Sequence, residues 1–481
     1  MAGIIAQAED GSCGQLIRPN ALFRQPLALQ WFEDGALRRR SEGERQAGRF
    51  ELFLDLLYVA ILANFAENLA EHVNGNQLLI FIPAWHVWSD LRELMNSFYN
   101  DDLAQRCLIL WVMAILVVYG NNATLVDEDI GAMRASVGAY LVARLSAMTA
   151  HLIYSFASYH HRAQQRLWVA LSFLGLLLYI PLFVETISLR AKVAVAFVAI
   201  IMEEFIWNFT YSPLAKKLLK AKYTTAVDIG HEIDRFAAFF IIVLGEFLYQ
   251  IVVGSPAAVG FNMALLRAIW TLIVAFCLNW IYVHGDGSLA AVHPLRHNVL
   301  ASFAWVALHV PLVAGLLAGG HAAAVSAKIH DEEEYHHPEI WLLCGGISTG
   351  LICLWFLALL HKCSDASGTL LLPKVKLVHP LFVDNANLFL QHARIMFRPV
   401  MGIIICCLPL AHDLKITAIL STIMALLVFT VIWENVTSLT RGAKFWESWE
   451  GTDYPKSSDT LGRRKDDEDM DMQIEPGEKV V

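Results

Sequence analysis

The chain contains about twelve apolar runs that are each long enough to cross a lipid bilayer. Crossing about 30 Å of hydrocarbon takes about 20 residues of α-helix, and only helices and closed barrels satisfy their backbone hydrogen bonds there. Of the 481 residues, 56% are hydrophobic and only 17% are charged, which excludes a soluble fold. We predict an all-α, polytopic integral membrane helix bundle with spans at 52–71, 78–98, 103–121, 135–157, 167–185, 193–211, 236–254, 263–283, 299–320, 340–361, 395–411 and 415–434.

The Lys and Arg residues are distributed unequally between the two ends of these spans. Of the 36 bases, 28 fall on the side of the amino terminus and 6 on the other side, while Arg92 and Arg144 lie well inside spans and are counted on neither side. Cytoplasmic loops are enriched in Lys and Arg, so we predict that both termini are cytoplasmic, in the plasma membrane or an endomembrane. Residues 1–50 form a polar leader, residues 51–436 the bundle, and residues 437–481 an acidic, largely disordered tail.

Other features narrow the class of protein. The eight cysteines lack paired spacing and the bases are scattered over a chain of net charge −9, so we predict no disulfide framework, no metal site and no nucleic-acid partner. No enzyme motif or cofactor fingerprint is present, which favours a protein that is not an enzyme and needs no cofactor. The sequon at Asn122 falls on the predicted outer side, where it is a candidate for glycosylation.

Ionisable side chains inside a span cost about 2.5–3.5 kcal/mol each on insertion scales and are the first candidates for function. The candidates inside the spans are six carboxylates and two guanidiniums, so pairing leaves up to four of these acids without a base. A surplus of acids is what a proton or cation pathway needs, whereas the alternative is a polar interior held together by hydrogen bonds. One histidine, His309, also lies in the middle of a span. The candidates for a transport or proton pathway are therefore Asp55, Glu67, Asp90, Arg92, Arg144, Glu203, Glu204, Glu246 and His309.

Two of these candidates have specific expectations. Arg144 is the expected counter-charge of the adjacent acids Glu203 and Glu204, which point about 100° apart on a helix. His309 is followed by Gly315 and Gly319, a small-xxx-small pattern that predicts close helix packing around a satisfied histidine. The alternative for His309 is a proton relay with the acids.

Four blocks of the chain carry short motifs in a fixed order. They are ELFLDLLYVAILANFAENL at 51–69, WHVWSDLRELMNSFYNDD at 85–102, HEIDRFAAFFIIVLGE at 231–246 and ALHVPLVAGLLAGG at 307–320. These blocks resemble the ELFFDLVFV-type opening helix, the W-x-x-W … N-x-F-D-x-D-D stretch, the H-x-x-E-R-F … I-I-x-L-G-E helix and the H-x-P-L-x-x-G motif of the bacterial low temperature requirement A family. Tyr99 and Asp234 depart from the family's acid and glutamate at those positions.

The resemblance covers residues 50–320, and the last third of the chain looks like a fungal-type extension. It implies a polytopic membrane protein of a family named for a requirement for growth at low temperature. It also implies a set of site residues: Glu51, Asp55, Asn96, Asp101, Asp102, His231, Arg235, Glu246 and His309. Six residues are expected at the cytoplasmic face as an inner gate or ion-pair cluster: Asn96, Asp101, Asp102, His231, Asp234 and Arg235.

The leading hypothesis is a protein that moves a proton, a cation or a small solute, with the intramembrane carboxylates as its pathway. Its partners would be the lipid bilayer and an unknown small solute or a proton, and its oligomeric state is open. A second hypothesis is a membrane-embedded enzyme that acts on a lipid or isoprenoid with the carboxylates as general acids. A third is a non-catalytic membrane stress-response protein.

Overall fold

The structure is a computed structural model that describes residues 22–40, 47–71, 77–100, 102–253, 260–284, 291–329, 337–363, 393–411 and 414–438. These residues contain 11 helices that are long and apolar enough to cross a membrane, which confirms the predicted all-α polytopic bundle. The helices are α1 (Arg49–Glu71), α2 (Gln77–Ser97), α3 (Leu103–Ala123), α4 (Ile130–Ala157), α5 (Arg162–Leu176), α6 (Leu189–Tyr211), α7 (Pro213–Leu219), α8 (Ile229–Val252), α9 (Met263–Val283), α10 (Pro294–His297), α11 (Val299–Lys328), α12 (His337–Leu360), α14 (Phe397–Cys407) and α15 (Ile416–Ser438), with the 3₁₀ helices η1 (Leu177–Phe183) and η2 (Leu408–Leu410).

Helix α2 corresponds to the predicted span 78–98 and is not among these 11 helices. It is as long as its neighbours but far more polar. Its 21 residues include Asp90, Arg92 and Glu93. The helix packs against α1, α4 and α6 inside the bundle. A helix with this much charge is stable there only if its neighbours supply partners. The polar contacts of α2 are therefore the place to look for a functional site.

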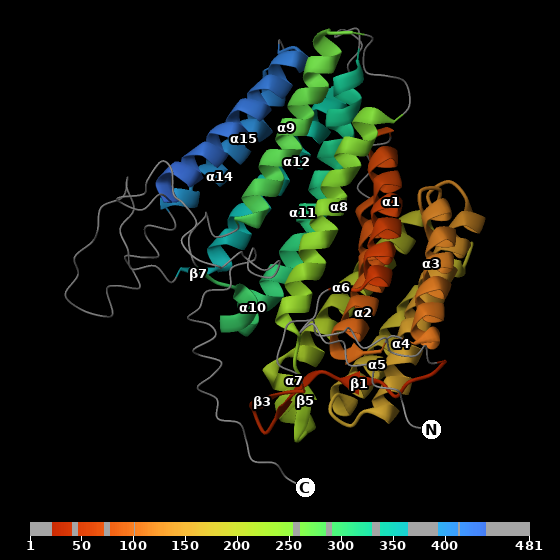
Figure 1. Ribbon diagram of the computed structural model, residues 1–481. Helices are drawn as coiled ribbons and strands as arrows, with labels where there is room; N and C mark the ends of the chain where they lie inside the picture. The colour runs from red at the N-terminus through yellow and green to blue at the C-terminus, as the bar shows by residue number, and fades with distance from the viewer. Residues whose placement is uncertain are drawn as a thin grey trace, which may run out of the picture.

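Helix α1 lies between two groups of helices (Figure 1). It packs on α2 and α3 on one side and on α8 and α11 on the other. Helices α2–α6 form the first group, and α8, α9, α11, α12, α14 and α15 form the second. The fold thus has a seam at which α1 and α2 meet α8 and α11.

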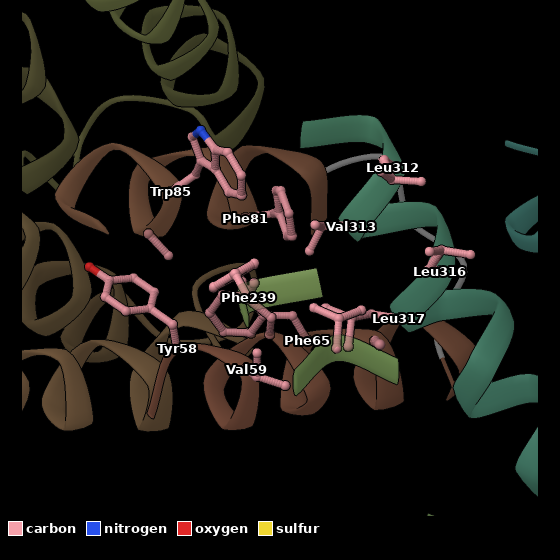
Figure 2. Close-up of a cluster of buried hydrophobic side chains, with 14 of the residues drawn as sticks. Tyr58, Val59, Phe65, Phe81, Trp85, Phe239, Leu312, Val313, Leu316 and Leu317 are labelled. Carbon is pink, nitrogen blue, oxygen red and sulfur yellow. The ribbon is translucent and has the colours of Figure 1, made fainter. Parts of the chain in front are cut away.

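The seam is filled with apolar side chains (Figure 2). Phe65 of α1, Phe81 and Trp85 of α2, Phe239 of α8 and Leu316 of α11 are all at most 6% exposed. The Trp85 and Phe239 rings pack edge to face with their centroids 5.9 Å apart. This part of the seam is therefore mainly apolar.

Helices α11 and α12 approach each other closely through glycines. A Cβ atom added at Gly346 of α12 would lie 2.5 Å from both the Gly315 carbonyl oxygen and the Gly319 amide nitrogen of α11. Both neighbours are backbone atoms, which cannot rotate away. The predicted small-xxx-small face of α11 is therefore the contact surface for α12.

Replacing Gly346 by alanine is expected to destabilise the protein by about 1–3 kcal/mol, because the methyl group overpacks this contact. Gly345→Ala is the matched control, since a Cβ at Gly345 meets no atom within 4 Å. Thermal unfolding in detergent should give a lower midpoint for Gly346→Ala and an unchanged or higher midpoint for Gly345→Ala. Equal midpoints would show that the two helices are not held at this distance.

Small sheets cover the end of the bundle at which α2 finishes. Strand β2 (Gln30–Glu33) pairs with β3 (Ala36–Arg39) and β5 (Tyr223–Thr225), and β1 (Leu27–Ala28) pairs with β4 (Phe98–Tyr99). The β2–β3 turn is Asp34-Gly35 with φ of 48° and 87°, the type I′ geometry that Asp-Gly favours. Residues 27–39 lie in the segment predicted to be a polar leader, so part of that leader is folded. A further pair, β6 (Ala291–Val292) with β7 (Lys362–Cys363), lies in the second half of the chain.

The loop at residues 158–161 beneath this sheet is largely buried. The His161 side chain is fully buried, and its Nδ1 lies 3.2 Å from the Thr225 hydroxyl. Burial lowers the pKa of His161 to about 3, so the ring is neutral at physiological pH. The Trp31 ring covers the neighbouring His160 with their centroids 3.9 Å apart. The sheet is thus part of the packed protein rather than a detached leader.

Candidate functional site

Helix α2 presents polar side chains on two different faces. His86 and Asp90 are one turn apart and face α4 and α6. Trp88, Arg92 and Asn96 also repeat every fourth residue and face α1 and α8. Because positions i and i+4 share a helix face, the two sets belong to two separate polar networks.

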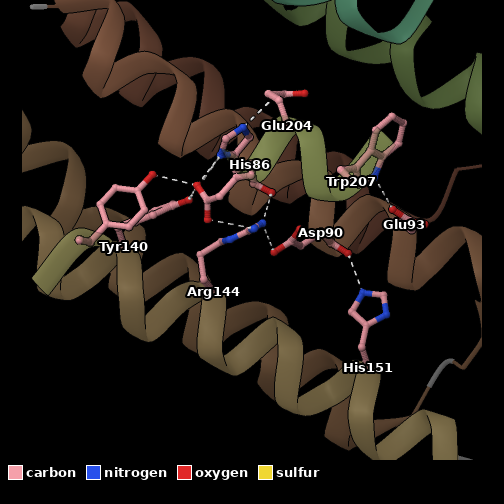
Figure 3. A network of polar contacts seen from close by, with 10 residues as sticks. His86, Asp90, Glu93, Tyr140, Arg144, His151, Glu204 and Trp207 are labelled. Atoms are coloured by element: carbon pink, nitrogen blue, oxygen red, sulfur yellow. Dashed lines mark hydrogen bonds and ion pairs between the residues drawn. The ribbon is translucent and has the colours of Figure 1, made fainter. Parts of the chain in front are cut away.

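The first network, the histidine–carboxylate cluster, joins α2 to α4, η1 and α6. Its members are His86, Asp90, Tyr140, Arg144, Tyr179, Glu203 and Glu204. His86 lies between two carboxylates (Figure 3): its Nδ1 is 3.1 Å from Glu203 Oε2 and its Nε2 is 2.9 Å from Glu204 Oε1. The Glu203 side chain is 1% exposed, whereas that of Glu204 is 45% exposed. One acid is therefore locked inside the bundle and the other is accessible.

Glu203 is surrounded by hydrogen-bond donors. The hydroxyls of Tyr140 and Tyr179 donate to its Oε2 at 2.6 and 2.8 Å, and Arg144 Nη2 donates to its Oε1 at 3.2 Å. Arg144 also forms an ion pair with Asp90, with Nη1 and Oδ2 2.5 Å apart. Three donors, one of them a guanidinium, hold Glu203 as an ionised acceptor.

The geometry of His86 requires an additional proton. A carboxylate only accepts hydrogen bonds, and a neutral imidazole donates from one nitrogen alone. With a carboxylate on each ring nitrogen, either the imidazole carries two protons or one carboxyl group is protonated. In both cases His86, Glu203 and Glu204 together hold one proton more than a neutral histidine and two carboxylates. Because Glu203 already accepts hydrogen bonds from three donors, we assign that proton to His86 and Glu204.

A polar cavity lies beside this proton. It has a volume of about 50 Å³; His86, Asp90, Arg144, Glu203 and Glu204 line its polar part, and mainly apolar residues of α2, α5, α6 and α11 line the rest. A cavity of more than about 10–15 Å³ with several polar partners holds water. Water in this cavity would contact both His86 and Glu204 and would give the shared proton an exchange partner at membrane depth.

The second network, the arginine–carboxylate cluster, joins α1, α2 and α8 at the seam. Its members are Glu51, Asp55, Trp88, Arg92, Asn96, His231, Glu232 and Arg235. Asp55 Oδ1 accepts from Trp88 Nε1 and from Arg235 Nη2, both at 2.7 Å. Glu51 Oε2 lies 2.7 Å from His231 Nε2. This cluster binds the two helix groups together across α1.

Arg92 and Asn96 complete the second network on the α2 side. Arg92 Nη1 lies 2.7 Å from Glu232 Oε1, and its guanidinium carbon is 5.2 Å from the Trp88 ring centroid, the i,i+4 cation–π geometry. Asn96 Nδ2 donates to Glu232 Oε2 at 3.1 Å and lies 3.3 Å from His231 Nδ1. Every charge of this cluster therefore has an opposite charge or a hydrogen-bond partner.

Three pathway candidates lie outside both networks. Glu67 is exposed near the far end of α1, and Glu246 is half-buried and accepts from Gln250 at 2.7 Å. His309 is 1% exposed, with Nδ1 2.7 Å from the Trp305 carbonyl oxygen and Nε2 3.1 Å from the Tyr282 hydroxyl. The structure therefore does not join the six intramembrane acids into one pathway.

The expected gate residues are also divided. Asn96, His231 and Arg235 meet in the arginine–carboxylate cluster. Asp102 instead caps α3 by accepting from the Gln105 amide at 2.8 Å, and Asp234 is half-buried on α8. Asp101 lies outside the described residues, as do 439–481 of the predicted tail and 1–21 of the leader. Asn122, the sequon residue, is in the last turn of α3 and donates to the Val118 carbonyl oxygen.

The bases differ from the prediction in two places. Arg235 was expected in the loop before the seventh span, and Arg398 was counted with the cytoplasmic bases although the predicted span 395–411 includes it; both are buried inside helices. Helix α8 begins earlier than predicted because Asp228 caps it, accepting from the His231 amide at 3.3 Å. With Arg235 on Asp55, the surplus of unpaired acids is smaller than the sequence indicates.

The histidine–carboxylate cluster also contains three residues that the sequence analysis did not single out: His86, Tyr140 and Tyr179. One signal was present, because His86 stands one turn before Asp90 in an apolar helix. The two tyrosines gave none, since a tyrosine in a span is commonly an interface or core residue. No three His, Cys, Asp or Glu side chains of the described ranges converge as ligands for a metal ion.

Comparison with known proteins places most of the chain in one family. The sequence profile described as bacterial low temperature requirement A protein (LtrA) matches residues 46–432, more than half of the chain. The match extends beyond residue 320, where the four motif blocks end, and includes α12, α14 and most of α15. Searches of curated proteins and of solved structures return no match.

Proposed function

The chain belongs to the low temperature requirement A family, and on that premise we propose that it carries protons across the membrane, alone or coupled to a small solute. The observation that supports this proposal is the position of His86 between the carboxylates of Glu203 and Glu204, which requires an additional proton. This proton sits at membrane depth, next to a polar cavity, on an acid that is 45% exposed. A buried site that must hold a proton, and that can exchange it with water, is the element a proton carrier needs.

The polar groups of α2 give this site access from one end. From His86 toward the carboxyl end of α2 the same helix face carries Asp90 and Glu93. From His86 toward the amino end the sequence reads LLIFIPAW from residue 78, without an ionisable group. The apolar seam packs around that half (Figure 2). Transfer would thus need a rearrangement that opens the apolar half, as in alternating access.

We further propose that the polar end faces the cytoplasm. The distribution of Lys and Arg favours cytoplasmic termini, and α2 runs toward that side in the predicted topology. Protons would then reach His86 from the cytoplasm in the conformation described. Transport and the sidedness of the termini are separate proposals, because the site can work in either orientation.

The test is proton flux in vesicles that contain the purified full chain, a pH dye and an imposed potassium diffusion potential. His86→Gln and Glu204→Gln are expected to reduce flux to the rate of protein-free vesicles, because the shared proton loses its carrier. Glu67→Gln is the matched control, since Glu67 is an exposed acid outside both networks. Unchanged flux in both site variants, with each folded, would rule out the proposed carrier role.

A further inference from the structure

A second pocket, separate from the polar cavity, lies between α2, α3, α4, η1 and α6. Its volume is about 90 Å³, and its wall is mainly apolar, with Ile80, Pro83, Tyr119, Val137, Leu182 and Ile200 among the lining residues. An engineered apolar cavity of about 150 Å³ stays dry and binds benzene, so a pocket of this kind favours an apolar occupant over water. Without an occupant the lining atoms lose their packing partners.

Two polar groups in the pocket lack partners of their own. Lys192 lies in the first turn of α6, is only 5% exposed, and forms no ion pair with a described residue, including Asp127 at the same end. The Ser136 side chain on α4 is 2% exposed, and its hydroxyl has no hydrogen-bond partner among the described residues. A buried unpaired hydroxyl is costly, so Ser136 indicates a missing hydrogen-bond partner, and Lys192 adds a positive charge without an ion pair to the same pocket.

The spacing of these groups fits an amphiphile that enters from one end of the bundle. Lys192, Ala196 and Ile200 follow one face of α6 at four-residue intervals and all line the pocket. Eight residues of helix correspond to about 12 Å, the length of several methylene groups. The first turn of a membrane helix lies at the depth of the lipid phosphates. An anionic headgroup would therefore meet Lys192 while its chain follows the face of α6.

We propose that this pocket binds one acyl chain of an anionic phospholipid. The phosphate pairs with the Lys192 ammonium, an ester carbonyl accepts a hydrogen bond from Ser136, and the chain lies against Pro83 and Ile200. The ligand is a membrane lipid rather than free phosphate, because the greater part of the lining is apolar.

The bound lipid would also stabilise the hydrogen bonds of the proton site. This step rests on the proposed function. The rings of Tyr140 and Tyr179 line the pocket, and their hydroxyls donate to Glu203 at 2.6 and 2.8 Å. A chain packed against both rings restricts their motion and so holds the donors of Glu203 in place. Lipid binding itself does not depend on this step.

Native mass spectrometry of the full chain in detergent tests the binding directly. Titrations compare phosphatidylglycerol, phosphatidylcholine of the same chains, and glycerol phosphate as a headgroup without chains. We expect phosphatidylglycerol to bind most tightly and glycerol phosphate not to bind. Equal binding of the two phospholipids would overturn the anionic site, and binding of glycerol phosphate at the affinity of phosphatidylglycerol would overturn the lipid-chain site.

Variants locate the binding in this pocket. Lys192→Gln is expected to weaken phosphatidylglycerol binding about fivefold, the effect of one basic residue on an anionic lipid. Arg190→Gln is the matched control, because Arg190 is exposed two residues away. Ala196→Phe fills the pocket and should abolish binding of both phospholipids. Should Lys192→Gln misfold, Ser136→Ala serves in its place, with about a two- to tenfold loss expected.

Two results would overturn the proposal: equal losses in Lys192→Gln and Arg190→Gln, or full binding in a folded Ala196→Phe variant. Proton flux with and without phosphatidylglycerol is measured in the same preparations. Lipid binding without flux would contradict the proposed function and leave the lipid site standing, whereas flux without lipid binding would do the reverse.

Discussion

Replacing Arg144 by methionine is expected to lower the free energy of unfolding by about 3–5 kcal/mol, the cost of removing one partner from a buried ion pair. Arg144 is 4% exposed and is the guanidinium that contacts both Asp90 and Glu203 in the histidine–carboxylate cluster. Methionine fills a similar volume but offers no charge and no donor. Two buried carboxylates would then face each other without their counter-charge. Equilibrium unfolding in mixed micelles measures the difference.

The same helix provides the control for this prediction. Arg134 of α4 is 45% exposed at the side chain and lies 3.7 Å from Glu185, which is 74% exposed. Exposed ion pairs contribute at most about 1 kcal/mol, so Arg134→Met should change stability by no more than that. Similar losses for Arg134→Met and Arg144→Met would show that burial of the cluster does not set its energy.

The helices were predictable because hydrophobic length is a local property. The predicted spans correspond to helices of the structure, including α2 with its three charges. The hairpin of β2 and β3 was not predicted, although the Asp34-Gly35 turn between two short apolar stretches is a strong hairpin signal. Its strands are four residues long and lie in a segment rich in charge, so composition outweighed the turn.

Two kinds of contact in the site were predictable from the sequence: contacts between residues one turn apart on the same helix, and the pairing of a base with nearby acids. Trp88 and Arg92 lie one turn apart, so their cation–π contact follows from helical spacing, and Arg144 was the expected partner of the adjacent acids at 203 and 204. The pair formed by Glu51 and His231 joins residues 180 apart in sequence. Which helix faces meet across such a distance depends on the rotation and packing of every helix between them, which the pattern of one chain does not specify.

Arg398 shows how a charge in a span can mislead. With Pro399 and Pro409 it appeared to interrupt the eleventh span, because each breaks an apolar run or a helix. In the structure α14 continues through Arg398 to Cys407, and the arginine is fully buried. Its partner is Glu434 of α15, an acid at the end of the last predicted span. A charge that weakens a span in isolation thus contributes to the packing of two spans.

The second large effect is expected for Arg398→Met, again a loss of about 3–5 kcal/mol in the free energy of unfolding. Arg398 Nε and Nη2 donate to the two carboxylate oxygens of Glu434 at 2.6 and 2.8 Å, a bidentate pair. Its Nη1 also donates to the Leu354 carbonyl oxygen at 2.9 Å. One side chain therefore ties α14 to α15 and α12. Its loss leaves Glu434, which is 2% exposed, as an uncompensated buried acid.

The double variant Arg398→Met with Glu434→Leu separates the two roles that a buried pair can have. When both charges are replaced by apolar groups of similar volume, stability is often regained in full, because neither partner is left to be desolvated alone. We expect the double variant to unfold within about 1 kcal/mol of the unaltered protein, and the single Glu434→Leu variant to be as unstable as Arg398→Met. The proton flux of the double variant should be unchanged, because Arg398 and Glu434 lie outside the histidine–carboxylate cluster. A stable double variant without flux would instead extend the proton pathway to α14 and α15, and an unstable one would show that the bidentate geometry itself holds these helices.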